Sequence, residues 1–266
     1  MKGILKGIGF FILYFGLTIG FQMILSMVFM AFGAFSGLRD ENALIDFVNS
    51  NILGMTMLSG VLVVTVLFFI FKVRKADIKK EWKLRRFQLK EMVLPVIVAF
   101  SYSFLYALMI YDIELDNSVM IQNSVTYYSG VCRGLGLVFM IINLLIIAPV
   151  SEEIALRGIV YTRVEKTTNA AAAIVISSLL FGVMHIAAGG IVLVIGAMFM
   201  GAVFGLVFYK TNSLFICFIA HSAANLPDFI LSGHPAFSNE VMLVLKCVFG
   251  LVFIIGMIFM FKKSEI

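Results

Sequence analysis

Residues 133–160 read RGLGLVFMIINLLIIAPVSEEIALRGIV, and this stretch decides the class of fold. A strongly apolar run is followed by two adjacent carboxylates and an arginine. About 20 apolar residues in an α-helix span a bilayer core of roughly 30 Å. Runs of this length recur along the chain, which is 62% hydrophobic and 13% charged. Soluble domains are about half apolar and a quarter charged, so the sequence predicts a polytopic membrane protein.

The apolar runs predict an all-α bundle of about eight transmembrane helices. The expected spans are 8–35, 52–71, 92–111, 133–160, 169–188, 191–209, 213–230 and 241–261. The first run is too long for a signal peptide and is interpreted as a span. Within one integral membrane domain we expect helices 1–3 in residues 1–130, a catalytic core of helices 4–7 in residues 131–232, and helix 8 in residues 233–266.

The orientation of the bundle follows from its loops. Cytoplasmic loops carry an excess of Lys and Arg, and the loop 72–90 is by far the most basic. Counting spans outward from it places both termini in the cytoplasm and the acidic segments 40–46 and 112–116 outside. The basic residues of the loop are Lys72, Arg74, Lys75, Lys79, Lys80, Lys83, Arg85, Arg86 and Lys90.

The basic loop has two interpretations. With Trp82, Leu84 and Phe87 among its charges, it can lie on the membrane as an amphipathic helix. It can equally be a solvated loop that only sets the topology. The net charge of +5 does not indicate nucleic acid as a partner, because no basic face with interleaved aromatic residues is present.

The cysteines and one histidine are not expected to carry chemistry. Cys132, Cys217 and Cys247 are scattered in or beside apolar runs, which is typical of small buried residues and not of a disulfide framework or a thiolate metal site. His234 lies between Gly233 and Pro235, a pattern that predicts an external turn.

The fourth span carries charges where a membrane helix should not. A charge near the bilayer centre costs about 2.5–3.5 kcal/mol on insertion scales, so such residues are functional candidates by default. Glu153 and Arg157 are four residues apart and can pair on one helix face. Glu152 is rotated by about 100° from that face and is left free for proton chemistry. Alternatively, these charges only mark the cytoplasmic end of the span.

Two later spans contain the remaining polar candidates. His185 lies in the fifth span, and His221 shares a face of the seventh with Asn225. Each could be a packing residue that hydrogen-bonds between helices. Together they suit one task, because a carboxylate and an imidazole can hold and deprotonate water, while a second imidazole and an amide can stabilise an oxyanion.

Three motifs, as they stand here, resemble one known family. They are Glu-Glu-x-x-x-Arg at 152–157, Phe-x-x-x-His at 181–185 and His-x-x-x-Asn at 221–225. In order and spacing they resemble the CAAX-protease and bacteriocin-processing (CPBP, or Abi) family of intramembrane proteases, over about residues 130–230. The resemblance implies an eight-helix fold, which agrees with the number of apolar runs.

The resemblance also assigns roles to the first motif. Glu152 would be the general base, and Glu153 with Arg157 would support it. Phe181, from the second motif, would shape the pocket.

The resemblance implies that the other polar residues serve the attacking water. His185 would help to hold or activate it, and His221 with Asn225 would bind the water, a metal or the oxyanion. Family members are commonly described as metalloproteases, so a divalent metal such as zinc could be held by Glu152, His185 and His221. A Glu and a His could also activate water without a metal. The chain lacks His-Glu-x-x-His and Gly-x-Ser-x-Gly, which disfavours a zincin or serine mechanism.

The sequence therefore predicts an intramembrane endopeptidase in the cell membrane, with its active site toward the cytoplasm. Its substrate would be a membrane-embedded or lipid-associated peptide or protein precursor, such as a leader peptide, a pheromone or a bacteriocin. A proton-coupled transporter could use the same Glu and His residues as a relay, although no internal symmetry is visible. A non-catalytic bacteriocin-immunity or scaffold protein is the other alternative, but it would have no reason to retain these motifs.

Overall fold

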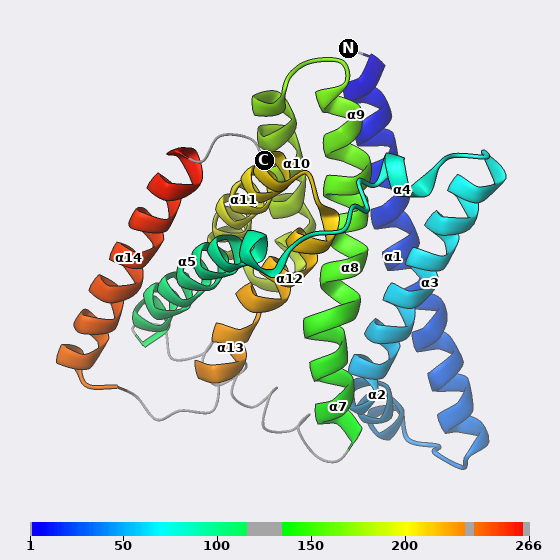
Figure 1. Ribbon diagram of the computed structural model, residues 1–266. Coiled ribbons are helices and arrows are strands. Elements are labelled where there is room, and N and C mark those ends of the chain that lie inside the picture. Colours follow the sequence, from blue (N-terminus) through cyan, green and yellow to red (C-terminus); the bar gives the residue numbers. More distant parts are fainter. Residues whose placement is uncertain (1, 116–134, 232–236, 263–266) are drawn as a thin grey trace.

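The computed structural model is a helical bundle (Figure 1). It describes residues 2–115, 135–231 and 237–262, and leaves out the side chains of 111–115, 135–136, 187–189 and 228–229. All regular structure in the described part is helical, which confirms the predicted fold class of a multi-pass membrane bundle. The predictions for Cys132 and His234 fall outside the described residues, and so does Asp116, the last acidic residue of segment 112–116.

Six helical stretches in the described part are long and apolar enough to cross a membrane. One is a central column that runs from residue 135 to residue 165. Apart from the column, the five long helices are α1 (Lys2–Phe35), α3 (Ile52–Val73), α5 (Leu89–Leu115), α11 (Ile186–Thr211) and α14 (Asn239–Lys262). Four of them, α1, α3, α5 and α14, are less than half buried, whereas the fifth, α11, is more than half buried.

The other two predicted spans, 169–188 and 213–230, are shorter helices than expected. The first is α10 (Ala170–Met184), with 15 residues. The second is α12 (Leu214–Ala224), with 11 residues, which is followed by α13 (Leu226–Leu231). Both helices end at a polar motif residue, His185 for α10 and Asn225 for α12. These residues were expected inside spans and instead lie at helix junctions.

The central column is not a regular α-helix. In order it contains α7 (Leu135–Ile142), the π-helical segment η1 (Asn143–Ile147), α8 (Ala148–Glu153), a second π-helical segment η2 (Ile154–Tyr161), and α9 (Thr162–Glu165). Pro149 is in the first turn of α8, and its missing N–H interrupts the helical hydrogen bonds. The two π-helical segments, a form often found at functional sites, flank α8, which ends with the Glu152–Glu153 pair.

The core of the protein surrounds η2. Every residue of this segment is buried, and it packs against α1, α10, α11 and α12. Small residues let α10 and α11 come close together: a Cβ on Gly201 would lie 2.9 Å from Ser178 Cα and 3.1 Å from Phe181 Cβ. The second half of the central column is thus enclosed by α1 and α11 and by α10 and α12, the two helices that carry the other motifs.

The basic segment 72–90 is fixed to one end of the bundle. Between the end of α3 at Val73 and the start of α5 at Leu89, the segment forms a single helical turn, α4 (Ile78–Glu81). Trp82 is buried, with its ring 5.4 Å from that of Phe71, and the Arg85 guanidinium donates to the carbonyl of Thr211 at 2.8 Å. The predicted amphipathic surface helix is therefore not formed, and neither is a free solvated loop, because aromatic burial and this hydrogen bond tie the segment down.

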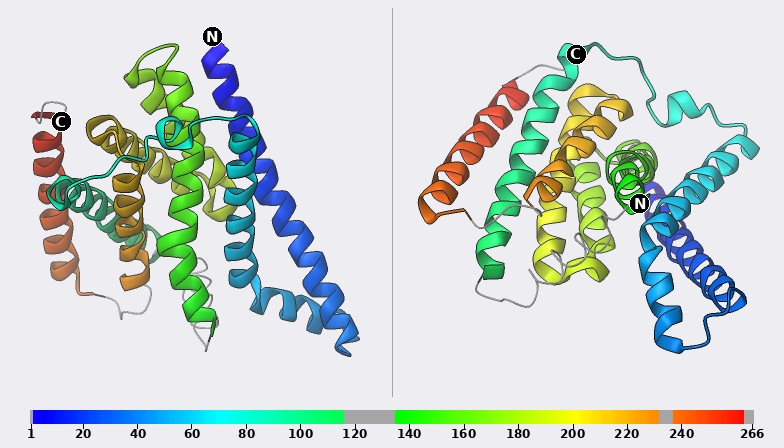
Figure 2. Two further views of the ribbon diagram at one scale, coloured as in Figure 1. Left: turned by 45° about the vertical axis from the view of Figure 1, so that its right-hand side comes forward. Right: turned by 90° about the horizontal axis from the view of Figure 1, so that it is seen from below.

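The start of α1 and the end of α14 lie at the same end of the bundle, together with α4 (Figures 1 and 2). The amphipathic helix α2 (Glu41–Ser50), which the sequence did not predict, lies at the opposite end. Asp40 caps it by accepting a hydrogen bond from the Ala43 N–H at 2.9 Å, as Asp commonly does at this position.

Candidate active site

A buried ion pair lies at the junction of α8 and η2. Arg157 Nη1 donates to Glu153 Oε1 at 2.9 Å, and neither side chain is exposed. Arg157 Nη2 also donates to the Gly201 carbonyl of α11 at 2.7 Å. The guanidinium carbon lies 5.1 Å from the ring centroid of Phe181 and 5.3 Å from that of Phe204. The pairing predicted from the spacing of Glu153 and Arg157 is present, and two aromatic rings enclose it.

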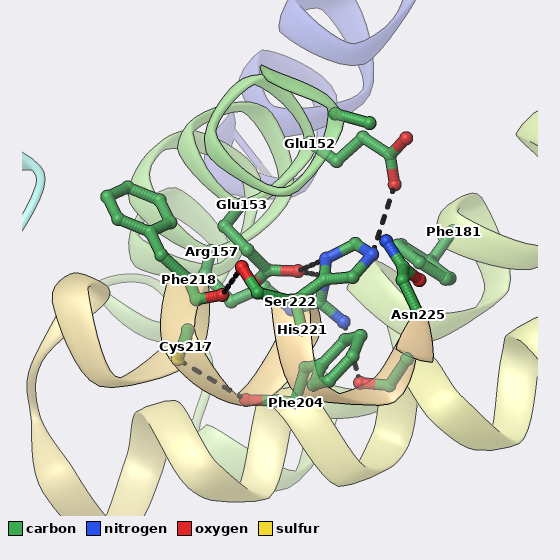
Figure 3. Close-up of polar contacts among 12 residues, drawn as sticks. Glu152, Glu153, Arg157, Phe181, Phe204, Cys217, Phe218, His221, Ser222 and Asn225 are labelled. Carbon is green, nitrogen blue, oxygen red and sulfur yellow. Dashed lines mark hydrogen bonds and ion pairs between the residues drawn. The ribbon is translucent and has the colours of Figure 1, made fainter. Parts of the chain in front are cut away.

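His221 joins this pair to the second carboxylate (Figure 3). Its Nδ1 lies 3.0 Å from Glu153 Oε1, and its Nε2 lies 3.8 Å from Glu152 Oε2. The imidazole stacks on Phe204 with 4.6 Å between centroids. An ionised carboxylate only accepts hydrogen bonds, so Nδ1 carries a hydrogen and Nε2 is the atom directed toward Glu152.

Glu152 is the carboxylate that can take part in proton chemistry. Its Oε2 is buried and has no hydrogen-bond partner among the described residues. The side chain also lines a cavity of about 430 Å³ between α1, α3 and the η1–α8 part of the column. Glu153 Oε2 also lacks a hydrogen-bond partner among the described residues, but Glu153 Oε1 is committed to Arg157 and His221, and Glu153 does not line the cavity.

Asn225 and its neighbour Ser222 tie α12 to η1. Asn225 Nδ2 donates to the Leu144 carbonyl at 2.8 Å, and Ser222 Oγ donates to the Leu145 carbonyl at 2.6 Å. Pro149 has no N–H to offer the preceding turn, so the Leu145 carbonyl four residues earlier lacks its helical donor and can accept from Ser222. An amide group has two hydrogens to donate, so one hydrogen of Asn225 Nδ2 remains available. Asn225 lies one helical turn after His221.

His185 lies one aromatic ring away from the other site residues. Its Nδ1 is 2.7 Å from the Phe181 carbonyl. Within the described ranges no hydrogen bond or ion pair connects it to Glu152 or His221. The Phe181 ring contacts both imidazoles, at 4.9 Å from His185 and 5.7 Å from His221. Of the predicted site residues, the structure brings together Glu152, Glu153, Arg157 and His221, with Asn225 beside them and His185 farther out.

The predicted metal ligands do not form a three-ligand set. Catalytic zinc sites have three protein ligands and an open position. In the part of the chain that the structure describes, no three His, Cys, Asp or Glu side chains gather in this way. Glu152 approaches His221, but His185 is held at Phe181, so these residues do not fit such a centre as arranged, and zinc stays a prediction.

Several residues at the site were not predicted from the sequence. Gly201 supplies a carbonyl to Arg157, and Phe204 supplies the ring under His221; both depend on how α11 packs. Tyr14, from α1, lines the cavity beside Glu152. A signal for this wall does exist in the sequence, because Tyr14, Thr18 and Gln22 repeat every four residues along one face of an apolar helix.

Comparison with known proteins finds a family model that is similar to the core of the chain. Residues 134–227 match the family model described as "Type II CAAX prenyl endopeptidase Rce1-like". The matched segment contains all six predicted site residues and confirms the resemblance seen in the motifs.

One relative extends the similarity toward the rest of the chain. An uncharacterized protein of Mycoplasma capricolum subsp. capricolum is 28% identical over 233 residues, which cover 81% of this chain and 66% of the relative. The chain thus aligns with about two thirds of that relative's length. No solved structure matches the chain.

Proposed function

From the match of the membrane-embedded core to CAAX prenyl endopeptidases, we propose that the chain hydrolyses a peptide bond of a membrane-associated peptide or protein, using a water activated by Glu152. One observation carries this proposal. Glu152 presents a carboxylate oxygen without a hydrogen-bond partner among the described residues, 3.8 Å from an imidazole nitrogen and at the wall of a cavity.

The charges of the site support a shared proton between Glu152 and His221. Net charge is costly inside a membrane. Glu153 and Arg157 neutralise each other, so the site as a whole is neutral when Glu152 and His221 hold one proton between them. With that proton on His221, Glu152 is an ionised base and Nε2 is a hydrogen-bond donor. This is the state in which the two residues can begin the reaction.

The reaction follows from this starting state. Glu152 takes a proton from a water as the water oxygen attacks the scissile carbonyl carbon. Nε2–H of His221 and the second amide hydrogen of Asn225 donate to the oxyanion that forms. When the carbon–nitrogen bond breaks, Glu152 gives its proton to the departing amine. Glu153 keeps His221 in the required orientation and balances its charge, as an acidic residue does for the histidine of a Ser-His-Asp triad.

The arrangement of the polar groups favours a hydrolase over a transporter. A proton relay extends through the membrane, whereas a hydrolase gathers its groups around one point. In the described residues, Glu152, Glu153, Arg157 and His221 surround one point, and one hydrogen bond joins His221 to Glu153.

The test compares membranes that contain the wild type, Glu152→Gln or Glu41→Gln. Gln keeps the size of Glu152 but cannot accept the proton, so the new peptide N-termini generated by the wild type are expected to fall by roughly 10²–10⁴-fold. Glu41, an exposed residue of α2, serves as the matched control and should leave the termini unchanged. Identical termini in all three membranes, at equal protein levels, would refute the proposed function.

A further inference from the structure

The cavity beside Glu152 extends well beyond the catalytic groups. Tyr14, Ser151 and Glu152 line one part of it, and Gln22 and Asn143 line another. Gln22 follows Tyr14 by eight residues along α1, and Asn143 precedes Glu152 by nine along the column. At 1.5 Å per residue both separations correspond to roughly 12–14 Å. The volume of about 430 Å³ is within the range of small-molecule and peptide pockets.

Most hydroxyl groups on the wall of this cavity donate to backbone carbonyls. Thr18 Oγ1 donates to Tyr14 O at 2.9 Å, Thr56 Oγ1 to Ile52 O at 2.8 Å, and Ser59 Oγ to Thr18 O at 3.3 Å. These hydroxyls are therefore occupied within the protein and present largely apolar surface to the cavity.

The amides of Gln22 and Asn143 behave differently. Neither side chain has a hydrogen-bond partner among the residues that the structure describes. Each amide offers two donors and an acceptor, and leaving such a group unpaired in an apolar environment is unfavourable. One amide comes from α1 and the other from η1, so two different walls of the cavity contribute polar groups away from Glu152.

We propose that this cavity binds an extended, uncharged peptide segment of the substrate, and that the amides of Gln22 and Asn143 hydrogen-bond its backbone. A peptide backbone offers the N–H and C=O groups that an amide needs inside a membrane, whereas a hydrocarbon chain offers none. Extended chain rises about 3.3 Å per residue, so the segment contacts the amides about four residues from the scissile bond. Among the described residues, Glu152 is the only charged one on the wall, and burying an unpaired charge against the largely apolar remainder is costly, so we expect the segment to carry no charged side chains.

This inference rests on the proposed function and is tested by binding, without cleavage. The full chain carrying Glu152→Gln is placed in nanodiscs with a fluorescent ten-residue peptide of Leu, Ala and Ser. A second probe is the same peptide with N-methylated backbone nitrogens, which cannot donate. Gln22→Leu and Asn143→Leu remove each amide while keeping its bulk. Ser26→Ala is the control, because Ser26 donates to its own helix at Gln22 O and does not line the cavity.

Loss of either amide is expected to weaken binding of the plain peptide by roughly three- to tenfold, the effect of one hydrogen bond. The control should bind as the parent does, and the methylated peptide should bind weakly to every chain. The inference is overturned if the plain peptide binds none of the chains, or if the leucine variants bind it as well as the parent does. It is also overturned if farnesyl-cysteine methyl ester displaces the peptide and binds the leucine variants more tightly than the parent. Cleavage is measured separately, so a wild type that binds but does not cleave would refute only the proposed function.

Discussion

Arg157 allows two adjacent carboxylates to exist inside an apolar bundle. Its guanidinium is fully buried, pairs with Glu153 and donates to the Gly201 carbonyl. Removing one member of a buried ion pair leaves an uncompensated charge and costs about 3–5 kcal/mol, whereas replacing both is far better tolerated. The pair therefore contributes less net stability than its geometry suggests, and its main effect is to fix the position of the Glu153 carboxylate beside His221.

Arg157→Met is expected to destabilise the protein by about 3–5 kcal/mol, because Glu153 is left buried without its cation. The double variant Glu153→Gln with Arg157→Met should recover much of this loss. Thermal unfolding in detergent measures both effects, and Arg39→Met, at an exposed position, should change stability by less than about 0.5 kcal/mol. This account would be contradicted if Arg157→Met were as stable as the wild type. It would also be contradicted if the double variant were destabilised by the sum of the two single-variant effects.

The sequence predicted the local part of this site but not the distant part. From the spacing of the residues on a helix, we predicted that Arg157 lies one turn from Glu153 and that Glu152 points away from both. The spacing could not show that His221 reaches Glu153 across 68 positions of the chain, because that contact depends on how α12 packs against the column. Nor could it show that His185 lies behind Phe181, since the break between α10 and α11 moves it out of a continuous span.

At the scale of elements, the approach of α10 to α11 positions Arg157. Gly201 leaves no room for a side chain: a Cβ there would lie 2.9 Å from Ser178 Cα and 3.1 Å from Phe181 Cβ. The same residue supplies the carbonyl that accepts from Arg157. Helix packing and site geometry thus meet in a single residue.

Gly201→Ala should therefore separate α10 from α11 and shift the Arg157 contact. Overpacking of this kind costs about 1–3 kcal/mol, and we expect a loss of cleavage together with a lower unfolding temperature. Gly16→Ala is the matched control, because nothing lies within 4 Å of its added Cβ and Ala is favoured over Gly in a helix by about 0.5–1 kcal/mol. If both variants keep the stability and activity of the wild type, close helix contact is not what holds Arg157.

The irregular column shows what apolar patterning can and cannot predict. The range 133–160 was predicted as one span, and a helical column occupies its described part from residue 135 onward. Its π-helical segments escaped prediction because hydrophobicity does not distinguish hydrogen bonding at i+4 from i+5. Pro149 was the available signal, because its missing N–H frees a carbonyl of the preceding turn. In the structure, Asn225 and Ser222 donate to the Leu144 and Leu145 carbonyls.

At the scale of the whole molecule, the positions of the helix ends predict which end of the bundle faces the cytoplasm. The start of α1, the end of α14 and α4 share one end of the bundle, and α2 lies at the other (Figure 1). This agrees with an even number of crossings and with both termini on one side. Because basic segments stay in the cytoplasm, the end that carries residues 72–90 is expected to face inward.

Cysteine labelling tests this orientation on the full chain. After Cys132, Cys217 and Cys247 are replaced by Ala, a single cysteine is introduced as Lys79→Cys or Glu41→Cys, both at exposed positions. A membrane-impermeant maleimide should label Lys79→Cys only in inverted vesicles and Glu41→Cys only in intact cells. The reverse pattern would place the basic segment outside, and substrates would then have to be sought on the outer face. Labelling of both positions from one side would contradict the helix arrangement itself, because α2 and α4 lie at opposite ends of the bundle.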